Sequence, residues 1–131
     1  MKKLNEVYQS DDWKTEKHVP VIEAPDSVGN NETFTIRATV GKEIEHPNTI
    51  PHHIRWIQLF FLPDGKNIPV QIAAFEFSAH GDQELEKEEA GVFTNSSAST
   101  VVRIDGSGTL MASAFCNING LWQSSKTITC K

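Results

Sequence analysis

The sequence predicts an all-β fold, an immunoglobulin-like β-sandwich of seven strands. Apolar and polar residues alternate in short runs, and turn-forming residues separate these runs. A long helical period is found nowhere, although residues 5–15 are compatible with a helical turn. At 131 residues, the chain is most simply one domain over residues 1–131, large enough to bury a core without disulfides.

In chain order, the predicted strands cover residues 19–24, 33–40, 54–62, 70–79, 99–104, 110–116 and 126–130. Residues 33–40 alternate strictly between apolar and polar side chains, which is typical of a strand with one buried face. Residues 54–62 are apolar on both faces, so we expect a central strand covered on both sides. The sequence DGSG at residues 105–108 predicts a hairpin turn between two strands.

Composition excludes several classes of partner. The formal net charge is −5 and the basic residues are scattered, which argues against nucleic-acid binding. We expect no membrane span, because no run approaches about 18 apolar residues, and the polar start of the chain lacks the apolar core of a signal peptide. The expected location is the cytoplasm, and the acidic run at residues 84–89 is interpreted as a solvated loop.

Cysteine and histidine carry the chemistry. The five histidines are His18, His46, His52, His53 and His80, and one of the two cysteines, Cys116, lies in a compact motif. Thiolate together with neutral imidazole suits iron, copper or zinc and disfavours magnesium or calcium. Five histidines cannot all point into one site, and adjacent strand residues face opposite ways, so only one of His52 and His53 is expected to bind metal.

Cys130, next to the C-terminus, is the other cysteine. A disulfide to Cys116 would close a short loop. A cytosolic chain keeps its thiols reduced, however, so we interpret Cys130 as an incidental thiol and Cys116 as a free one.

Three motifs occur together in the chain: EKHVP at residues 16–20, HPNT at residues 46–49 followed by the His52-His53 pair, and CNINGLW at residues 116–122. In this combination the chain resembles the small one-iron superoxide reductases, the neelaredoxin-like family, from about Asp12 through Trp122. The C-terminal motif of that family reads Cys-Asn-x-His-Gly-Leu-Trp. Here Asn119 stands in the histidine place.

The resemblance implies one mononuclear iron per chain, held by four equatorial imidazoles and one axial cysteine, with a sixth position open to superoxide. Carried over residue by residue, it makes His18, His46 and His52 equatorial ligands and Cys116 the axial ligand. His53 and His80 then become structural, and Trp122 and Leu121 pack around the site. For Asn119 we expect either a long contact to the metal through Oδ1 or a water in its place, unless its side chain only caps the turn before Gly120.

The implied reaction is the one-electron reduction of superoxide to hydrogen peroxide, a detoxification. The resemblance gives Lys17 the role of attracting the anion and helping to protonate the product, and Glu16 that of binding ferric iron afterwards. The tetracysteine rubredoxin-like domain of the two-iron relatives is not expected with two cysteines, so a separate rubredoxin-like protein would donate electrons. One-iron relatives are commonly tetramers, which suggests a homotetramer by analogy.

Three other functions fit parts of the sequence. A metal-binding β-sandwich that lost reductase activity through Asn119 could serve as a metal carrier or sensor. A blue-copper electron carrier also uses cysteine and histidine, but the third histidine and the lack of a suitably placed methionine disfavour it, because Met1 and Met111 lie outside the motifs. A plain interaction module leaves the motifs unexplained.

Overall fold

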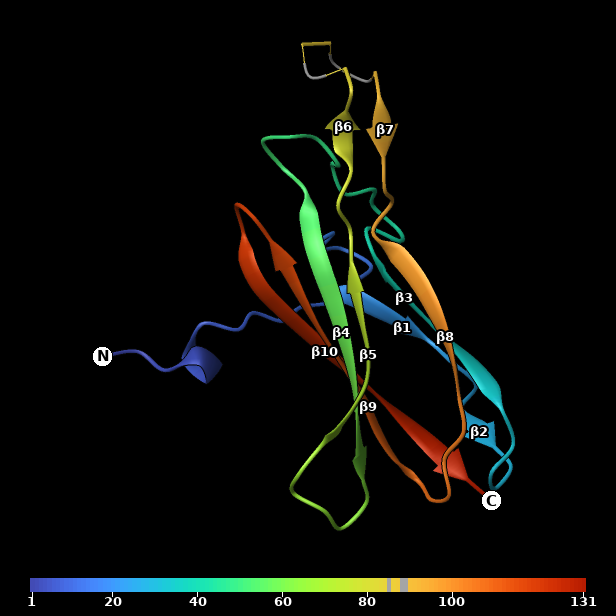
Figure 1. The fold of residues 1–131 in the computed structure, drawn as a ribbon. Coiled ribbons are helices and arrows are strands. Elements are labelled where there is room, and N and C mark those ends of the chain that lie inside the picture. The colour runs from blue at the N-terminus through green and yellow to red at the C-terminus, as the bar shows by residue number, and fades with distance from the viewer. Residues whose placement is uncertain (85, 88–89) are drawn as a thin grey trace.

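The computed structural model describes residues 1–84, 86–87 and 90–131, and it confirms the all-β sandwich (Figure 1). One short 3-10 helix, η1 (Leu4–Glu6), precedes the strands. The described strands are β1 (Pro20–Glu23), β2 (Ser27–Val28), β3 (Phe34–Val40), β4 (Ile54–Pro63), β5 (Val70–Glu76), β6 (His80–Asp82), β7 (Val92–Phe93), β8 (Ser97–Val102), β9 (Gly108–Cys116) and β10 (Gly120–Cys130).

The strands form two main sheets. The smaller sheet has the order β1-β3-β8 and the larger one β2-β10-β9-β4-β5, while β6 and β7 pair as a separate hairpin. In the larger sheet, β9 lies between β4 and β10 and is antiparallel to both. The residues that face the other sheet are the apolar half of each alternating strand, so Ile36, Ile57 and Leu59 are almost completely buried.

The seven predicted strands correspond to the seven longest observed ones. The predicted hairpin at residues 105–108 is wrong, because β8 belongs to the smaller sheet and β9 to the larger one. The turn therefore carries the chain from one sheet to the other. The true hairpin joins β9 to β10 through residues 117–119, and β10 begins at Gly120, well before the predicted start at residue 126.

The expected double coverage of the central strand is also incomplete. The inward side chains of β4, Ile57, Leu59 and Phe61, are buried, whereas the outward Trp56 and Phe60 remain partly exposed. An irregularity in the pairing of β4 with β9 between Ile54 and Trp56 allows Ile54 to face inward as well. The outer face of the larger sheet is thus only partly covered in a single chain.

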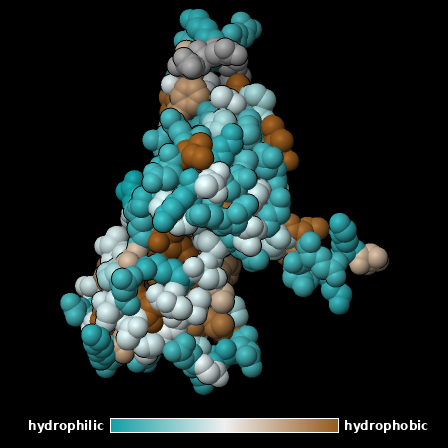
Figure 2. Space-filling model, turned by 180° about the vertical axis from the view of Figure 1, so that it is seen from behind, coloured by the Kyte–Doolittle hydropathy of each residue, from teal (hydrophilic) through white to brown (hydrophobic). Residues whose placement is uncertain are grey.

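The N-terminal residues stand away from the sandwich (Figure 1, Figure 2). Leu4 of η1 is exposed, and the helical turn expected within residues 5–15 is observed at Leu4–Glu6, partly upstream. Gln9 then joins the larger sheet through an isolated bridge to Trp122. No helix in the described ranges is long and apolar enough to cross a membrane. Residues 85, 88 and 89 of the acidic run lie outside the described residues.

Candidate metal centre

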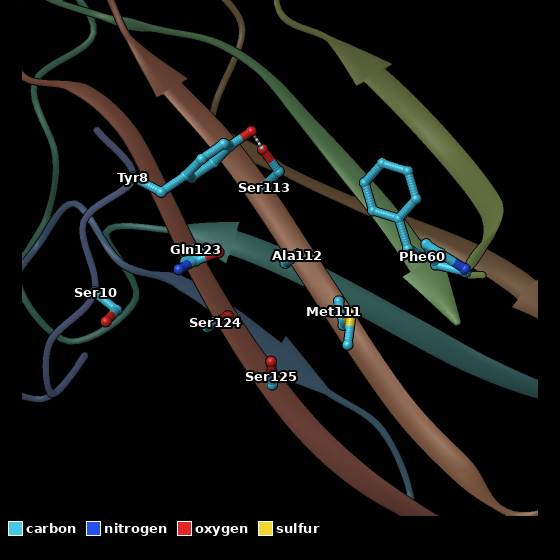
Figure 3. A pocket seen from close by; sticks show the side chains of 10 residues that line it. Tyr8, Ser10, Phe60, Met111, Ala112, Ser113, Gln123, Ser124 and Ser125 are labelled. Carbon is cyan, nitrogen blue, oxygen red and sulfur yellow. Dashed lines mark hydrogen bonds between the residues drawn. The ribbon is translucent and has the colours of Figure 1, made fainter. Parts of the chain in front are cut away.

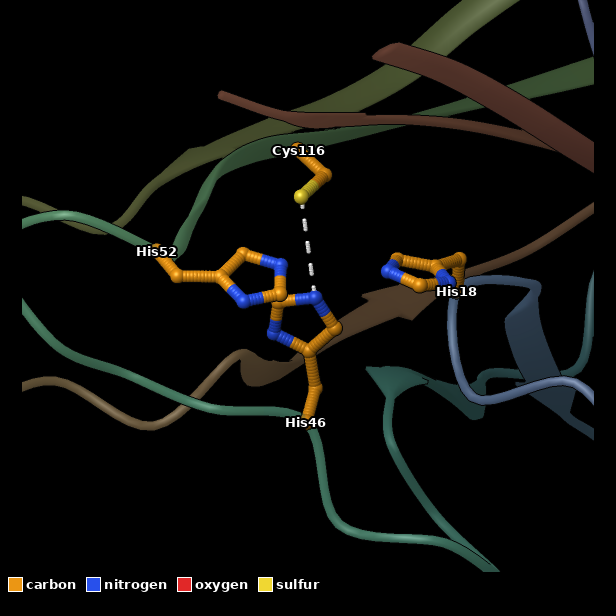
Figure 4. A group of neighbouring side chains, drawn as sticks. All are labelled: His18, His46, His52 and Cys116. Carbon is orange, nitrogen blue, oxygen red and sulfur yellow. Dashed lines mark hydrogen bonds between the residues drawn. The ribbon is translucent and has the colours of Figure 1, made fainter. Parts of the chain in front are cut away.

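Three connections at one end of the sandwich bring a cysteine and three histidines together (Figure 4). His18 lies just before β1, His46 and His52 lie between β3 and β4, and Cys116 is the last residue of β9. Each of these residues offers one donor atom, and the donor atoms lie within 4.8 Å of one another. The structure therefore gathers the four residues that the motifs select as firm ligands.

The connection between β3 and β4 is shaped to present its two histidines. Gly41 has φ +94°, and a Cβ on it would lie 2.5 Å from the backbone nitrogen of His46, so only glycine allows this close return of the chain. At the other end, backbone hydrogen bonds join Thr49 and His52 in both directions, at 2.9 and 3.2 Å. These contacts set the direction in which both imidazoles leave the backbone.

Acceptors on the outer side of two histidines fix their tautomers. Nδ1 of His18 lies 2.6 Å from Oε1 of Glu16, and Nδ1 of His46 lies 2.6 Å from the carbonyl oxygen of Pro47. We assign the protons to these two Nδ1 atoms, which leaves each Nε2 with a free lone pair. In the described part of the chain, Nε2 of His18 is buried without any hydrogen-bond partner.

Cys116 is 1% exposed, and its sulfur faces the histidines. Sγ lies 3.7 Å from Nε2 of His46 and accepts a hydrogen bond from the backbone nitrogen of Asn119 at 3.4 Å. The Asn119 side chain lies at the same place: its Oδ1 is 3.2 Å from Nε2 of His52 and 3.6 Å from Sγ. Asn119 is thus the exposed fifth polar group around the centre.

Burial favours the neutral form of two of the imidazoles, His46 and His52. Desolvation lowers the pKa of His46 from 6.5 to about 4, although its bond to Pro47 acts the other way. Desolvation also lowers the pKa of His52, and in both cases the positive charge of Lys17 adds to the effect. The hydrogen bond from His18 is the main cause that lowers the pKa of Glu16, so this carboxylate is anionic. Neutral imidazoles are the form that binds metal.

The surrounding residues occupy mostly the expected places. Trp122, 8% exposed, stacks on His18 with ring centroids 5.3 Å apart, which confirms its packing role. His53 points away from the donor group and stacks on His80, as expected for structural residues. Sequence reasoning missed Gln9, whose side chain donates to the carbonyl oxygen of Asn119 at 2.7 Å, because no motif marks it.

The donor set fits a soft or borderline transition metal. Three imidazoles and a thiol suit iron, zinc or copper. A metal ion of this kind would also give the buried Nε2 of His18 the partner that it lacks among the described residues. Met111 cannot complete a copper site. It lies five residues before Cys116 on the same strand, about 17 Å away at 3.4 Å per residue, and faces the opposite side of the sheet.

The comparisons with known proteins agree with this geometry. The sequence model of the desulfoferrodoxin family matches residues 10–125. The chain is 46% identical to the neelaredoxin of Megalodesulfovibrio gigas, over 98% of this chain and 99% of that protein. It is 43% identical to the superoxide reductase of Pyrococcus furiosus, over 95% of this chain and 98% of that protein. The solved structure of superoxide reductase (neelaredoxin) from Archaeoglobus fulgidus in the reduced form superposes with a TM-score of 0.83 at 41% identity, covering 94% of this chain and 98% of that one.

Proposed function

The chain belongs to the desulfoferrodoxin family, and from this membership we propose that it is a non-haem iron superoxide reductase. The observation that carries the proposal is the convergence of His18, His46, His52 and Cys116, whose donor atoms lie within 4.8 Å of one another. The functional alternative, a metal carrier that lost reductase activity through Asn119, is not favoured by the described residues or by the relatives.

The four residues would hold one iron ion. Bound ferrous iron would supply the electron that, with two protons, converts one superoxide anion into one molecule of hydrogen peroxide. The chain supplies the surroundings: neutral imidazoles because burial depresses the pKa of His46 and His52, and a buried thiol at Cys116. The backbone nitrogen of Asn119 donates to Sγ and so stabilises negative charge on the sulfur.

Lys17 provides the positive charge for an anionic substrate. Its ammonium depresses the pKa of both His46 and His52, after the larger effect of burial, so its charge is felt at the donor group. In a chain with a net charge of −5, this local charge attracts the superoxide anion to the centre. Its N–H groups would also donate to the reduced product.

Glu16 has a different position from the one that binding to oxidised iron requires. Its Oε1 accepts hydrogen bonds from both Nδ1 and the backbone nitrogen of His18, at 2.6 and 3.1 Å. In this state the carboxylate orients a ligand. For the proposed role toward ferric iron, Glu16 would have to leave these bonds, which its location in a loop outside the strands permits.

Asn119 takes the place of the fourth histidine in the proposed site. Oδ1 lies 3.2 Å from Nε2 of His52, so this amide oxygen and the imidazole are near enough to contact one bound ion together. A neutral amide oxygen is a harder and weaker donor to ferrous iron than imidazole. We therefore propose a weak fourth ligand.

The electrons would come from a separate rubredoxin-like protein, and the chain would assemble as a homotetramer in the cytoplasm. The assembly is supported by the outer face of the larger sheet, which is only partly covered and presents Trp56, Phe60 and Phe115 partly exposed. A pocket on this face lies beside Tyr8, whose hydroxyl pairs with Ser113 at 2.6 Å (Figure 3). The location is supported by the two free cysteines, which are typical of a reducing compartment.

The experiment that tests the function measures metal content, visible spectrum and product yield together. A superoxide reductase should contain about one iron per chain, show a thiolate-to-iron charge-transfer band, and form one hydrogen peroxide for each superoxide consumed when a reductant is present. A yield of one peroxide for every two superoxide anions, with oxygen release, would indicate dismutation instead. A purified protein that is fully stable but contains no iron would contradict the proposal.

A further inference from the structure

His53 and His80 form a pair of their own beside the metal centre. Their rings stack with centroids 3.7 Å apart and an angle of 11° between the planes. His53 is 9% exposed, and His80 is half-buried at the start of the β6–β7 hairpin. His53 directly follows His52, but its side chain points to the opposite side. The two rings therefore lie where the loop that carries His46 and His52 meets the hairpin.

Asn48 attaches this loop to the base of the hairpin. It lies between the two loop histidines, and both halves of its amide are used. Nδ2 donates to the carbonyl oxygen of Thr94 at 2.5 Å, and Oδ1 lies 2.5 Å from Nδ1 of His80. Because the amide nitrogen is committed to Thr94, Oδ1 is the acceptor and His80 is the donor. One side chain thus joins the ligand loop to β6, through His80, and to Thr94, which directly follows β7.

His53 holds the second half of the same loop. Its Nδ1 lies 2.9 Å from the carbonyl oxygen of Thr49, and its backbone nitrogen donates to Oδ1 of Asn117 at 2.8 Å. Asn117 follows Cys116, and its amide also donates to the carbonyl oxygen of Pro51 at 3.0 Å. The loop is therefore tied to the hairpin on one side and to the cysteine turn on the other.

We propose that His80 and Asn48 are positioning residues that hold the His46–His52 loop in its metal-binding conformation before the metal arrives. A loop outside the strands loses conformational entropy when metal orders it, and contacts that order it in advance remove this cost from binding. Mutation of residues that orient metal ligands commonly lowers metal affinity by about 10- to 100-fold. The inference rests on the proposed function only in that the cluster must bind a metal ion.

The test measures Zn²⁺ affinity of the metal-free chain by competition with a chromophoric chelator, and the visible spectrum of the Co²⁺ form. His80→Ala and Asn48→Ala should each weaken Zn²⁺ binding about tenfold and alter the Co²⁺ bands. The double variant should lose less affinity than the sum of the two single losses, because both changes remove the hydrogen bond between Asn48 and His80. His80→Phe, which keeps a ring to stack on His53 but loses the donor, should behave like His80→Ala.

Two further variants separate positioning from folding. His80→Gln retains an N–H donor and should stay near the wild-type affinity, whereas Val92→Ala, an exposed change on the same hairpin, should alter nothing. Affinities within twofold of wild type in Asn48→Ala and His80→Phe would overturn the proposal, as would strictly additive losses in the double variant. A wild-type chain that binds no Zn²⁺ would instead contradict the metal site itself.

Discussion

Asn119 offers the sharpest test of the proposed centre, because its side chain can be changed without moving its backbone. The carbonyl oxygen of Asn119 accepts from Gln9 at 2.7 Å and from the indole of Trp122 at 3.2 Å, and its nitrogen donates to Cys116 at 3.4 Å. None of these bonds uses the amide side chain. Asn119→His should therefore place an imidazole nitrogen where Oδ1 now lies.

The expected magnitude follows from the donor that is exchanged. If Oδ1 is a weak fourth ligand, Asn119→His should tighten Fe²⁺ binding about tenfold, equal to about 1.4 kcal/mol, and shift the charge-transfer band. Asn119→Ala should loosen binding by a similar factor, since it removes the oxygen that lies 3.2 Å from His52.

The assay is anaerobic titration of metal-free protein with Fe²⁺ in the presence of a competing chelator, followed by the visible spectrum after oxidation. Ile118→Ala is the matched control, because Ile118 lies in the same turn and its side chain is 61% exposed. Affinity, spectrum and reaction rate that stay at wild-type values in both Asn119 variants would show that the side chain only caps the turn before Gly120. The alignment of Asn119 with the ligand place would then be wrong.

Three further predictions address the other parts of the site. Cys116→Ser should abolish the charge-transfer band and most activity while Cys130→Ser preserves both; the strand register places the two sulfurs about 27 Å apart or more, so equal losses would contradict the assignment. Lys17→Ala should slow the reaction with superoxide about tenfold and flatten its salt dependence, whereas Lys17→Arg should retain both, as stopped-flow rates at several ionic strengths would reveal. The metal-free chain should lose up to about 3 kcal/mol of stability as the pH falls from 6.5 to about 4, because the folded state holds the pKa of His46 below its unfolded value and protons therefore favour the unfolded chain. Urea unfolding at several pH values would measure this loss, and the stability of His46→Asn should depend less on pH than that of the wild type.

Local patterns were sufficient for the strands but insufficient for the way the strands are shared between sheets. Alternation along residues 33–40 reports which side chains face a core, and the structure agrees. The DGSG turn at residues 105–108 reports only that the chain changes direction. Whether the next strand pairs with the previous one depends on contacts between distant residues, and here β8 pairs with β3 while β9 pairs with β4 and β10. No signal of a few residues contains that choice.

The same limit applies to the site. Residue type and motif pointed to His18, His46, His52 and Cys116, because thiol and imidazole groups are ligands for transition metals. Nothing in the sequence showed that Glu16 lies on Nδ1 of His18, since an exposed loop carboxylate has many partners available. The bond between Asn48 and His80 joins residues 32 positions apart, and their pairing arises only when the hairpin folds against the loop.

The position of the one departure from the family motif explains how a reductase site could tolerate it. His18, His46 and Cys116 are 7%, 6% and 1% exposed, and their outer atoms are held by Glu16, Pro47 and the turn backbone. Asn119, by contrast, is exposed and lies next to the half-buried His52. We therefore expect metal retention to depend mainly on the three buried donors. The exchange of histidine for asparagine falls on the solvent side, where we expect a weaker ligand to affect how fast metal leaves more than whether the site forms. Accordingly, chelator-driven iron release should slow in Asn119→His but accelerate strongly in His46→Asn; equal release rates in the two variants would mean that the exposed and buried donors contribute alike.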